Sequence, residues 1–214
     1  MRSKSEIINE IKGICKSVDA EKDFKKTRAQ LDLLINELRA IDGTVSNQYP
    51  IDKVKGVWKQ LWTDQYYPIP SFLKLVPDQI FQIVSENGYY WNASNTRIFN
   101  TLTASGFLRG KYKNIYGSPT VEIEFTKNGF RPFKLPTTNL FSFVQNIENG
   151  KSFIISTGKN PPNGPIGIKG TLTSLYVDEN IRIDLGSQTD YYNVNNQLIV
   201  PGFENTLFIL EKVK

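Results

Sequence analysis

The segment Tyr176–Gly186 carries the side chains with the clearest chemical use, Asp178 and Arg182. A carboxylate can act as a general acid or base, but only if its surroundings tune its pKa strongly. From position 181 onward, apolar residues alternate with charged ones, which predicts a strand with Arg182 on its charged face. The Asp-Glu-Asn sequence before that strand is typical of a turn, which gives Asp178 a structural role as the alternative to a functional one.

Composition excludes several kinds of site. The chain has 214 residues and no histidine, which excludes Ser-His-Asp and Cys-His catalysis and argues against most zinc and non-haem iron sites. Its one cysteine, Cys15, falls in an apolar helical pattern, so we interpret it as a core residue; a redox-active or lipidated thiol is the alternative. We therefore expect no catalytic residue, no metal and no cofactor.

Charge and hydropathy bear on the partners of the chain. The formal net charge is +5 and the pI is near 9.1, but lysine and arginine are spread along the sequence without a basic block. We therefore expect no nucleic-acid partner, whereas mild attraction to an anionic membrane surface is compatible with this charge. No stretch approaches the roughly 20 apolar residues of a spanning helix, so we expect a soluble or peripheral protein.

Residues 1–43 are predicted to be helical and residues 50–214 to be mainly β. Ser3 or Ser5 can cap a first helix, and an apolar stripe predicts a second helix at about Ala20–Ala40. A polar connector follows, and then short apolar runs recur about every ten residues, as in an antiparallel sandwich or barrel. We expect the helices to cover one face or end of a barrel, so that both parts form one folded unit.

The expected strands are short apolar runs bounded by turn residues. They are Gly56–Thr63, Gln79–Ser85, Tyr89–Ser94, Arg97–Ala104, Phe107–Tyr112, Thr120–Thr126, Ser152–Thr157, Gly170–Val177, Ile181–Leu185, Tyr191–Tyr192 with Leu198–Val200, and Thr206–Lys212. Asn87-Gly88 and Lys127-Asn-Gly129 are predicted turns. The Gly- and Pro-rich stretch Lys159–Gly170 is predicted to be a surface loop, as a rim or lid of the barrel.

Alternation in the first expected strand indicates which side chains face inward. Lys59 should point to solvent, which turns Trp58, Gln60 and Trp62 toward the interior. A buried amide needs hydrogen-bond partners, so Gln60 is either a structural cross-link or a ligand contact. Gly56-Val-Trp58 at the start of the β region and the strand-borne Arg182 near its end suggest a closed barrel whose ends meet.

Several motifs together resemble a known family. They are the helical lead, Gly56-Val-Trp58 with the following Leu-Trp-Thr, Ile80-Phe-Gln82 with Trp91-Asn92, and Tyr176–Gly186 with Leu207–Leu210. With them the chain resembles the plastid lipid-associated protein/fibrillin (PAP/fibrillin) family over nearly its full length, most specifically in the C-terminal motif. The residues at positions 60, 62 and 64 depart from the family pattern, as does a longer stretch between positions 186 and 205.

The resemblance implies a mainly β fold, a lipocalin-like antiparallel β-barrel with N-terminal helices. It implies a non-enzymatic protein that binds or carries an apolar lipid or isoprenoid, such as a prenylquinone or a carotenoid, at a thylakoid or lipid-droplet (plastoglobule) surface. The location would be the cytoplasm or peripheral thylakoid membrane of a cyanobacterium, or a plastid if the chain is eukaryotic and processed. The alternative is a scaffold that docks a prenyl diphosphate synthase or a membrane and has no ligand in the lumen.

The resemblance also implies roles for individual residues. Trp58 and Arg182 would close the barrel through a cation–π contact, with an ion pair of Arg182 to Asp178 or Asp184 as the alternative. Gln82 and Asn92 would be polar contacts in the lumen. The candidate ligand-binding residues are therefore Trp58, Gln60, Trp62, Gln82, Asn92, Tyr176, Asp178 and Arg182.

Overall fold

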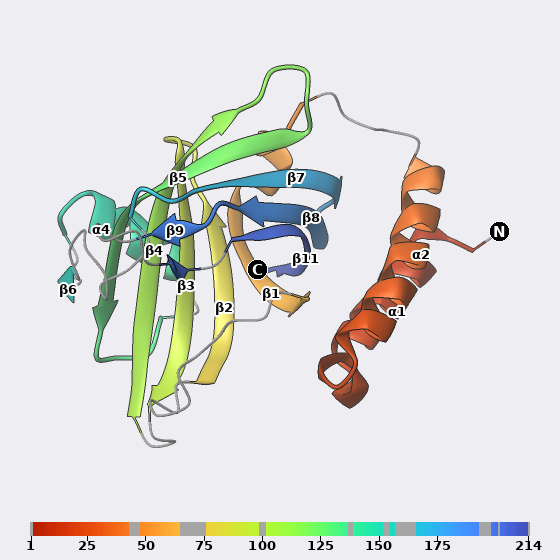
Figure 1. Ribbon diagram of the computed structural model, residues 1–214, viewed down its shortest axis with the longest axis horizontal. Helices are drawn as coiled ribbons and strands as arrows, with labels where there is room; N and C mark the ends of the chain where they lie inside the picture. The colour runs from red at the N-terminus through yellow and green to blue at the C-terminus, as the bar shows by residue number, and fades with distance from the viewer. Residues whose placement is uncertain are drawn as a thin grey trace.

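The computed structural model shows a β-barrel with helices packed on its outer faces (Figure 1). The described residues are 2–42, 48–64, 76–98, 102–136, 139–151, 155–156, 166–192, 198–200 and 202–213. The helices are α1 Lys4–Cys15, the 3₁₀ helix η1 Val18–Glu21, α2 Phe24–Asp42, α3 Ile51–Val54 and α4 Leu140–Glu148. The strands are β1 Gly56–Thr63, β2 Val76–Val84, β3 Tyr89–Ile98, β4 Leu102–Asn114, β5 Thr120–Arg131, β6 Ile155–Ser156, β7 Lys169–Val177, β8 Ile181–Gln188, β9 Tyr191–Tyr192, β10 Leu198–Val200 and β11 Phe203–Lys212.

Eight of the described strands close an antiparallel barrel, because β4 pairs with β5 as well as with β3. Around the barrel the order is β1, β2, β3, β4, β5, β7, β8 and β11, and β11 returns to pair with β1. The predicted fold class, mainly β with a lipocalin-like antiparallel barrel and N-terminal helices, is confirmed. This up-and-down order places the start of β1 at one end of the barrel, here called the base, and the end of β5 at the opposite, far end.

The barrel wall is apolar on both sides, which divides the core into three clusters. The interior cluster includes Trp58 and Leu210. A second cluster packs α1 and α2 on the outer face of the C-terminal strands, for example Ile11 with Ile183. A third packs α4 on the outer face of β1–β4, with Val144 among its buried residues. Figure 1 shows α1 and α2 on one side of the barrel and α4 on the opposite side.

Strand β8 explains why the helical layer is needed. Ile181 and Ile183 are fully buried and belong to the cluster that includes α1 and α2, so the apolar face of β8 is its outer face. Arg182 and Asp184 pair with Leu210 and Phe208, which belong to the interior cluster, so the charged face of β8 is its inner face. Without the helices, apolar area worth about 25 cal/mol per Å² would be returned to water.

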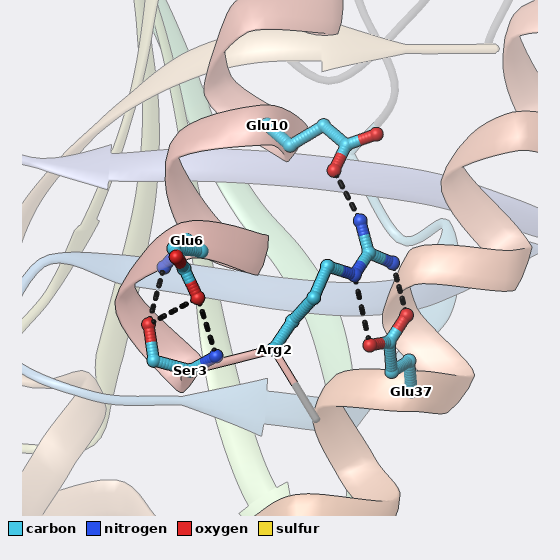
Figure 2. A network of polar contacts seen from close by, with 5 residues as sticks. All are labelled: Arg2, Ser3, Glu6, Glu10 and Glu37. Carbon is cyan, nitrogen blue, oxygen red and sulfur yellow. Dashed lines mark hydrogen bonds and ion pairs between the residues drawn. The ribbon is translucent and has the colours of Figure 1, made fainter.

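Polar contacts join the exposed ends of α1 and α2 (Figure 2). Ser3 caps α1, since its Oγ accepts a hydrogen bond from the Glu6 backbone N–H at 3.3 Å and the Glu6 carboxylate accepts one from the Ser3 backbone N–H at 2.6 Å. Arg2 spans both helices, because its Nε donates to Glu37 Oε1 at 3.0 Å and its Nη1 contacts Glu10. Exposed ion pairs contribute at most about 1 kcal/mol each, so this network mainly sets the orientation of the helices.

Two further contacts attach the helices to the last strand. Lys12 of α1 donates to Glu211 Oε1 at 2.8 Å. Arg28 of α2 pairs with Asp64, whose Oδ1 accepts a hydrogen bond from the Leu207 backbone N–H at 2.7 Å. The N-terminal helices are therefore tied to the C-terminal strand by charge as well as by apolar packing.

Several expected elements differ from the observed ones. The three strands expected between Tyr89 and Tyr112 are the two long strands β3 and β4. The expected turn Lys127-Asn-Gly129 lies inside β5, because pairing with β4 continues through it and outweighs the local turn signal. The turn at Asn87-Gly88 is confirmed, with φ of 83° at Gly88. Most of the expected loop Lys159–Gly170 lies outside the described residues.

The short helices α3 and α4 are additions to the expected elements. Helix α3 is a single turn, too short to give a periodic pattern. The N-cap residue of α4, Asn139, makes no side-chain cap hydrogen bond. The second expected helix begins later than predicted, at Phe24, because η1 occupies the residues before it.

Cys15 should be nearly unreactive in the native protein. Burial raises the pKa of its thiol to about 12, so the thiolate that attacks disulfide reagents is scarce near neutral pH. At pH 8 we expect labelling by a disulfide reagent to be at least about a thousandfold slower than for an unperturbed thiol with pKa near 8.5. The matched control is Asn9→Cys in a Cys15→Ala background, because Asn9 is exposed on the same helix. Equal labelling rates would contradict the buried position of Cys15.

Candidate functional site

The interior of the barrel is mostly apolar, and β8 inserts two charged side chains into it. The buried members of the interior cluster are Tyr49, Val54, Trp58, Val84, Tyr90, Val121, Ile123, Phe125, Ile168, Leu172, Val177, Phe208 and Leu210. Arg182 and Asp184 lie on the same inner face, each with 0% of its surface exposed. A buried charge is costly unless it is paired and hydrogen-bonded, so the partners of these two residues define the candidate site.

Arg182 has two partners in the interior. Its Nη2 is in ion-pair contact with Asp184 Oδ2, two residues along the same strand. The same nitrogen donates a hydrogen bond to the Tyr49 hydroxyl at 2.7 Å, and the guanidinium carbon lies 6.0 Å from the Tyr49 ring centroid. Tyr49 comes just before α3, so the segment that enters β1 closes the base of the barrel over this pair.

Other polar atoms of the interior have no hydrogen-bond partner within the described part of the chain. Arg182 Nε and Nη1 are buried donors without an acceptor, and Gln60 Oε1 and Gln82 Oε1 are buried acceptors without a donor. An unsatisfied buried polar atom costs about 1–3 kcal/mol, and native proteins keep few of them. The arrangement can therefore hold a molecule that offers an acceptor to the guanidinium and a donor to an amide oxygen.

The electrostatics of the interior follow from burial. Burial raises the pKa of Asp184, and the attraction of Arg182 offsets only part of that effect. For Arg182, burial disfavours the charged form, but the attraction of Asp184 and the neighbouring tyrosines outweighs it and raises the pKa. Burial also raises the pKa of Tyr49, so its hydroxyl stays protonated. The site thus presents a charged guanidinium beside a carboxyl group whose ionisation is opposed by burial and favoured by Arg182.

The cation over Trp58 is Lys212, which corrects the expectation that Arg182 occupies this place. Lys212 Nζ lies 4.3 Å from the Trp58 ring centroid and donates to the carbonyl oxygen of Lys55. Trp58 Nε1 donates to the Val54 carbonyl oxygen at 2.7 Å. Gly56 makes room for this contact, because a Cβ there would lie 2.9 Å from Lys212 Nζ and its φ is 110°. The cation–π closure of the barrel is therefore made by a lysine of β11.

The alternative role expected for Arg182 was an ion pair with Asp178 or Asp184, and the pair with Asp184 is present. Arg182 pairs with Asp184, which lies on its own strand, while Asp178 has other partners. Gly186 completes the motif for a steric reason, because a Cβ there would lie 2.5 Å from the Phe208 ring.

Five of the eight expected site residues face the interior. Trp58 and Arg182 do so by direct contact with interior residues. Gln82 pairs with Trp58 across β1 and β2, and Asn92 pairs with Gln82 on β3, so these side chains lie on the inner face as well. Gln60 pairs with the interior residue Leu210.

The expectation that Trp62 points into the interior is wrong. The register of β1 against β11 shifts between Gln60 and Trp62, so that Trp62 pairs with Ile209 on the outer face. There its Nε1 donates to the Ala20 carbonyl oxygen at 3.1 Å, and its ring lies 6.1 Å from that of Phe24. A β-bulge reverses the alternation of inward and outward side chains beyond it. The strict alternation assumed along this strand therefore placed Trp62 on the wrong face.

Tyr176 and Asp178 also lie outside the interior. Tyr176 belongs to the cluster of α1 and α2, and its hydroxyl donates to Asp178 Oδ2 at 2.9 Å. Asp178 Oδ1 accepts hydrogen bonds from the backbone N–H groups of Asn180 at 2.7 Å and Ile181 at 2.9 Å. These contacts are those of an Asx turn, so the structure gives Asp178 the turn role that its sequence indicated.

Sequence reasoning left out three residues of the interior polar group. Tyr49 lies in the polar connector and gives no periodic signal, while Lys212 looks like an ordinary lysine near the chain end. Tyr90, whose hydroxyl donates to Asn92 Oδ1 at 2.8 Å, could have been found, because it shares the parity of Asn92 on β3.

Other kinds of site receive no support from the described residues. No group of three or more acidic or cysteine side chains within them could hold a metal ion. None of the described helices is both long and apolar enough to cross a membrane.

Removing one member of the buried pair should destabilise the fold strongly. Arg182→Met leaves Asp184 buried without its cation, so we expect the free energy of unfolding in urea to fall by about 3–5 kcal/mol. The double variant Arg182→Met/Asp184→Leu removes both charges and should recover most of that loss. Lys12→Met is the control, because it breaks a partly exposed ion pair worth less than about 1 kcal/mol. A double variant no more stable than the single one would show that the pair is not the reason for the loss.

The chain matches the model of a known protein family. The PAP_fibrillin family model matches residues 1–194, which include α1, α2 and all the candidate site residues. No curated protein matches the chain. Because the match covers most of the sequence, the chain belongs to the PAP/fibrillin family, the plastid lipid-associated proteins.

Proposed function

We propose that the barrel binds one apolar lipid or isoprenoid molecule, such as a prenylquinone or a carotenoid, and carries or shields it at a lipid surface. The observation that carries this proposal is the fully buried Arg182, whose Nε and Nη1 have no acceptor among the described residues. Membership of a lipid-associated family supports the same conclusion.

The interior suits an amphiphile with a long apolar part and a small polar group. Its wall of aliphatic and aromatic side chains favours an apolar chain by about 25 cal/mol per Å² buried. The guanidinium of Arg182 is already balanced by Asp184, so its free N–H groups fit a neutral acceptor such as a carbonyl oxygen better than a second anion. Gln60 and Gln82 add polar contacts on the neighbouring strands.

The proposed role is non-catalytic. Asp178 is committed to its turn, and Asp184 is paired with Arg182. The hydroxyl of Tyr49 is held protonated by burial, far from the range in which it could transfer a proton near neutral pH. The protein would work at a thylakoid or plastoglobule surface, in a cyanobacterium or, after processing, in a plastid.

A scaffold role is the competing proposal. Its support is that bulky side chains, among them Trp58, Phe125 and Phe208, already occupy the interior. A barrel of eight strands has room only for its own side chains or for one small ligand. If the interior is full, the protein would act by docking a partner such as a prenyl diphosphate synthase, or a membrane. Ligand binding in the interior separates the two proposals.

Trp58 should report ligand binding, because it is the tryptophan that faces the interior, while Trp62 and Trp91 pack in the outer clusters. Titrating the protein with a decyl-substituted benzoquinone should quench tryptophan fluorescence in a saturable way. The double variant Trp62→Phe/Trp91→Phe should keep that saturable quenching, and Trp58→Phe should lose most of it. The measurement is steady-state fluorescence in the absence of vesicles.

Two outcomes would contradict the proposal. Saturable quenching that survives Trp58→Phe and disappears in the double variant would place the ligand on the outer face of the barrel. Quenching that never saturates, with no apolar molecule extracted from the purified protein, would favour the scaffold. Gln82→Leu tests the polar contact further, since it should weaken binding of the reduced benzoquinol, whose hydroxyl can donate to Gln82 Oε1, by about tenfold, equivalent to one hydrogen bond of about 1.4 kcal/mol.

A further inference from the structure

An aromatic and basic surface lies where β5 ends, at the far end of the barrel. Phe133 is 63% exposed and Phe130 is 40% exposed. Arg131 and Lys134 stand next to them in the sequence. We propose that these four residues, Phe130, Arg131, Phe133 and Lys134, here called the β5 rim, dock the protein on an anionic lipid surface. The proposed ligand carriage supplies the purpose of this docking, but the docking itself is a separate property.

The backbone of the β5 rim is held in place by buried polar side chains. Ser105 Oγ donates to the Phe133 carbonyl oxygen, and Asn95 Oδ1 accepts a hydrogen bond from the Leu135 backbone N–H at 2.8 Å. Ser105 and Asn95 are themselves 0% exposed. Exposing a large apolar side chain to water is unfavourable, and here hydrogen bonds to two buried side chains fix the backbone on both sides of the exposed Phe133 ring. A firmly held exposed aromatic is expected of a docking residue.

The charges of the β5 rim indicate which kind of partner surface it would bind. Arg131 Cζ lies 5.6 Å from the Phe133 ring centroid and 4.8 Å from that of Phe143 on α4, so the cation is packed among aromatic rings. Within the described residues, neither Arg131 nor Lys134 forms an ion pair with a carboxylate. Aromatic rings beside cations without counter-ions match the interface of an anionic lipid layer, which takes up the rings and attracts the charges.

The β5 rim also stands beside the interior of the barrel. Phe130 is two residues from Asn128, which pairs with Leu108 next to the interior cluster, so alternation puts Phe130 on the inner face. Its partial exposure marks a place where the inner face meets the surface, opposite the base that Tyr49 closes. A lipid layer docked here would lie next to that place, so an apolar molecule could pass between them with little exposure to water.

The β4–β5 hairpin at the base is the natural comparison for the β5 rim. Tyr116 at its tip is 99% exposed, so exposure of an aromatic alone does not distinguish the two ends. The lysines below that tip, however, have glutamates opposite them in the register, Lys113 with Glu122 and Lys111 with Glu124. Opposite charges across a strand pair attract each other and lower the net charge of that end. Around its exposed aromatic the base therefore carries less net positive charge than the β5 rim, where no carboxylate stands opposite Arg131 in the register.

The test measures binding of the ligand-free, full-length protein to vesicles by flotation. We expect binding to vesicles of phosphatidylcholine with phosphatidylglycerol and weaker binding to phosphatidylcholine alone. Phe133→Ser should lower the partition coefficient on anionic vesicles by about tenfold through lost apolar burial. Lys134→Glu should lower it by at least about tenfold through charge. Tyr116→Ser and Lys113→Glu are the matched controls at the base and should bind like the wild type.

Several outcomes would overturn the assignment. It fails if the wild type does not float with anionic vesicles, or if the β5 rim variants and the base variants lose binding equally. It also fails if Phe133→Ser abolishes capture of a protein partner while vesicle binding is unchanged, since the surface would then be a protein interface. Vesicle binding is measured without ligand and Trp58 quenching without vesicles, so each proposal can fail while the other stands.

Discussion

The pairing of Arg182 with Asp184 inside an apolar barrel sets conditions on every layer around it. A charge pair with no exposed surface has to keep its mutual contact and be closed off from water. Tyr49 meets the first condition by accepting a hydrogen bond from Arg182, and the second by covering the base. Because the charged face of β8 points inward, its apolar face points outward and needs the cover of α1 and α2. The orientation of this one strand, with its charged face inward and its apolar face outward, thus couples the interior, the base and the helical layer.

Local patterns were sufficient to predict the barrel and much of its inner face. The alternation of β8 is a short-range signal that puts Arg182 and Asp184 on one face of the strand, and the alternation of β1 puts Trp58 on the inner face. That the charged face of β8 points inward depends on the helices that cover its apolar face, and only the family resemblance indicated it. The Asx turn at Asp178 is equally local, which is why its residues indicated it.

The features that the sequence did not predict depend on contacts between distant segments. The β1 bulge that turns Trp62 outward is set by pairing with β11, and the two ends of that ladder are far apart in the chain. The cation over Trp58 could have been any lysine or arginine, and only the register of β11 selects Lys212. Tyr49 enters the site because the connector before β1 folds back over the base, which no periodicity reveals.

The attachment of α1 to β11 has a consequence for synthesis of the protein. Ribosomes make the N-terminus first, so α1 and α2 emerge long before Leu207, Ile209 and Glu211, the residues of the last strand against which they pack. The same strand completes the barrel by pairing with both β1 and β8. Contacts between sequence-distant segments form slowly, and unpaired apolar helices and strand edges invite aggregation meanwhile. The nascent chain thus remains without its closing strand until β11 has been made, although α1 and α2 have been exposed since the start of synthesis.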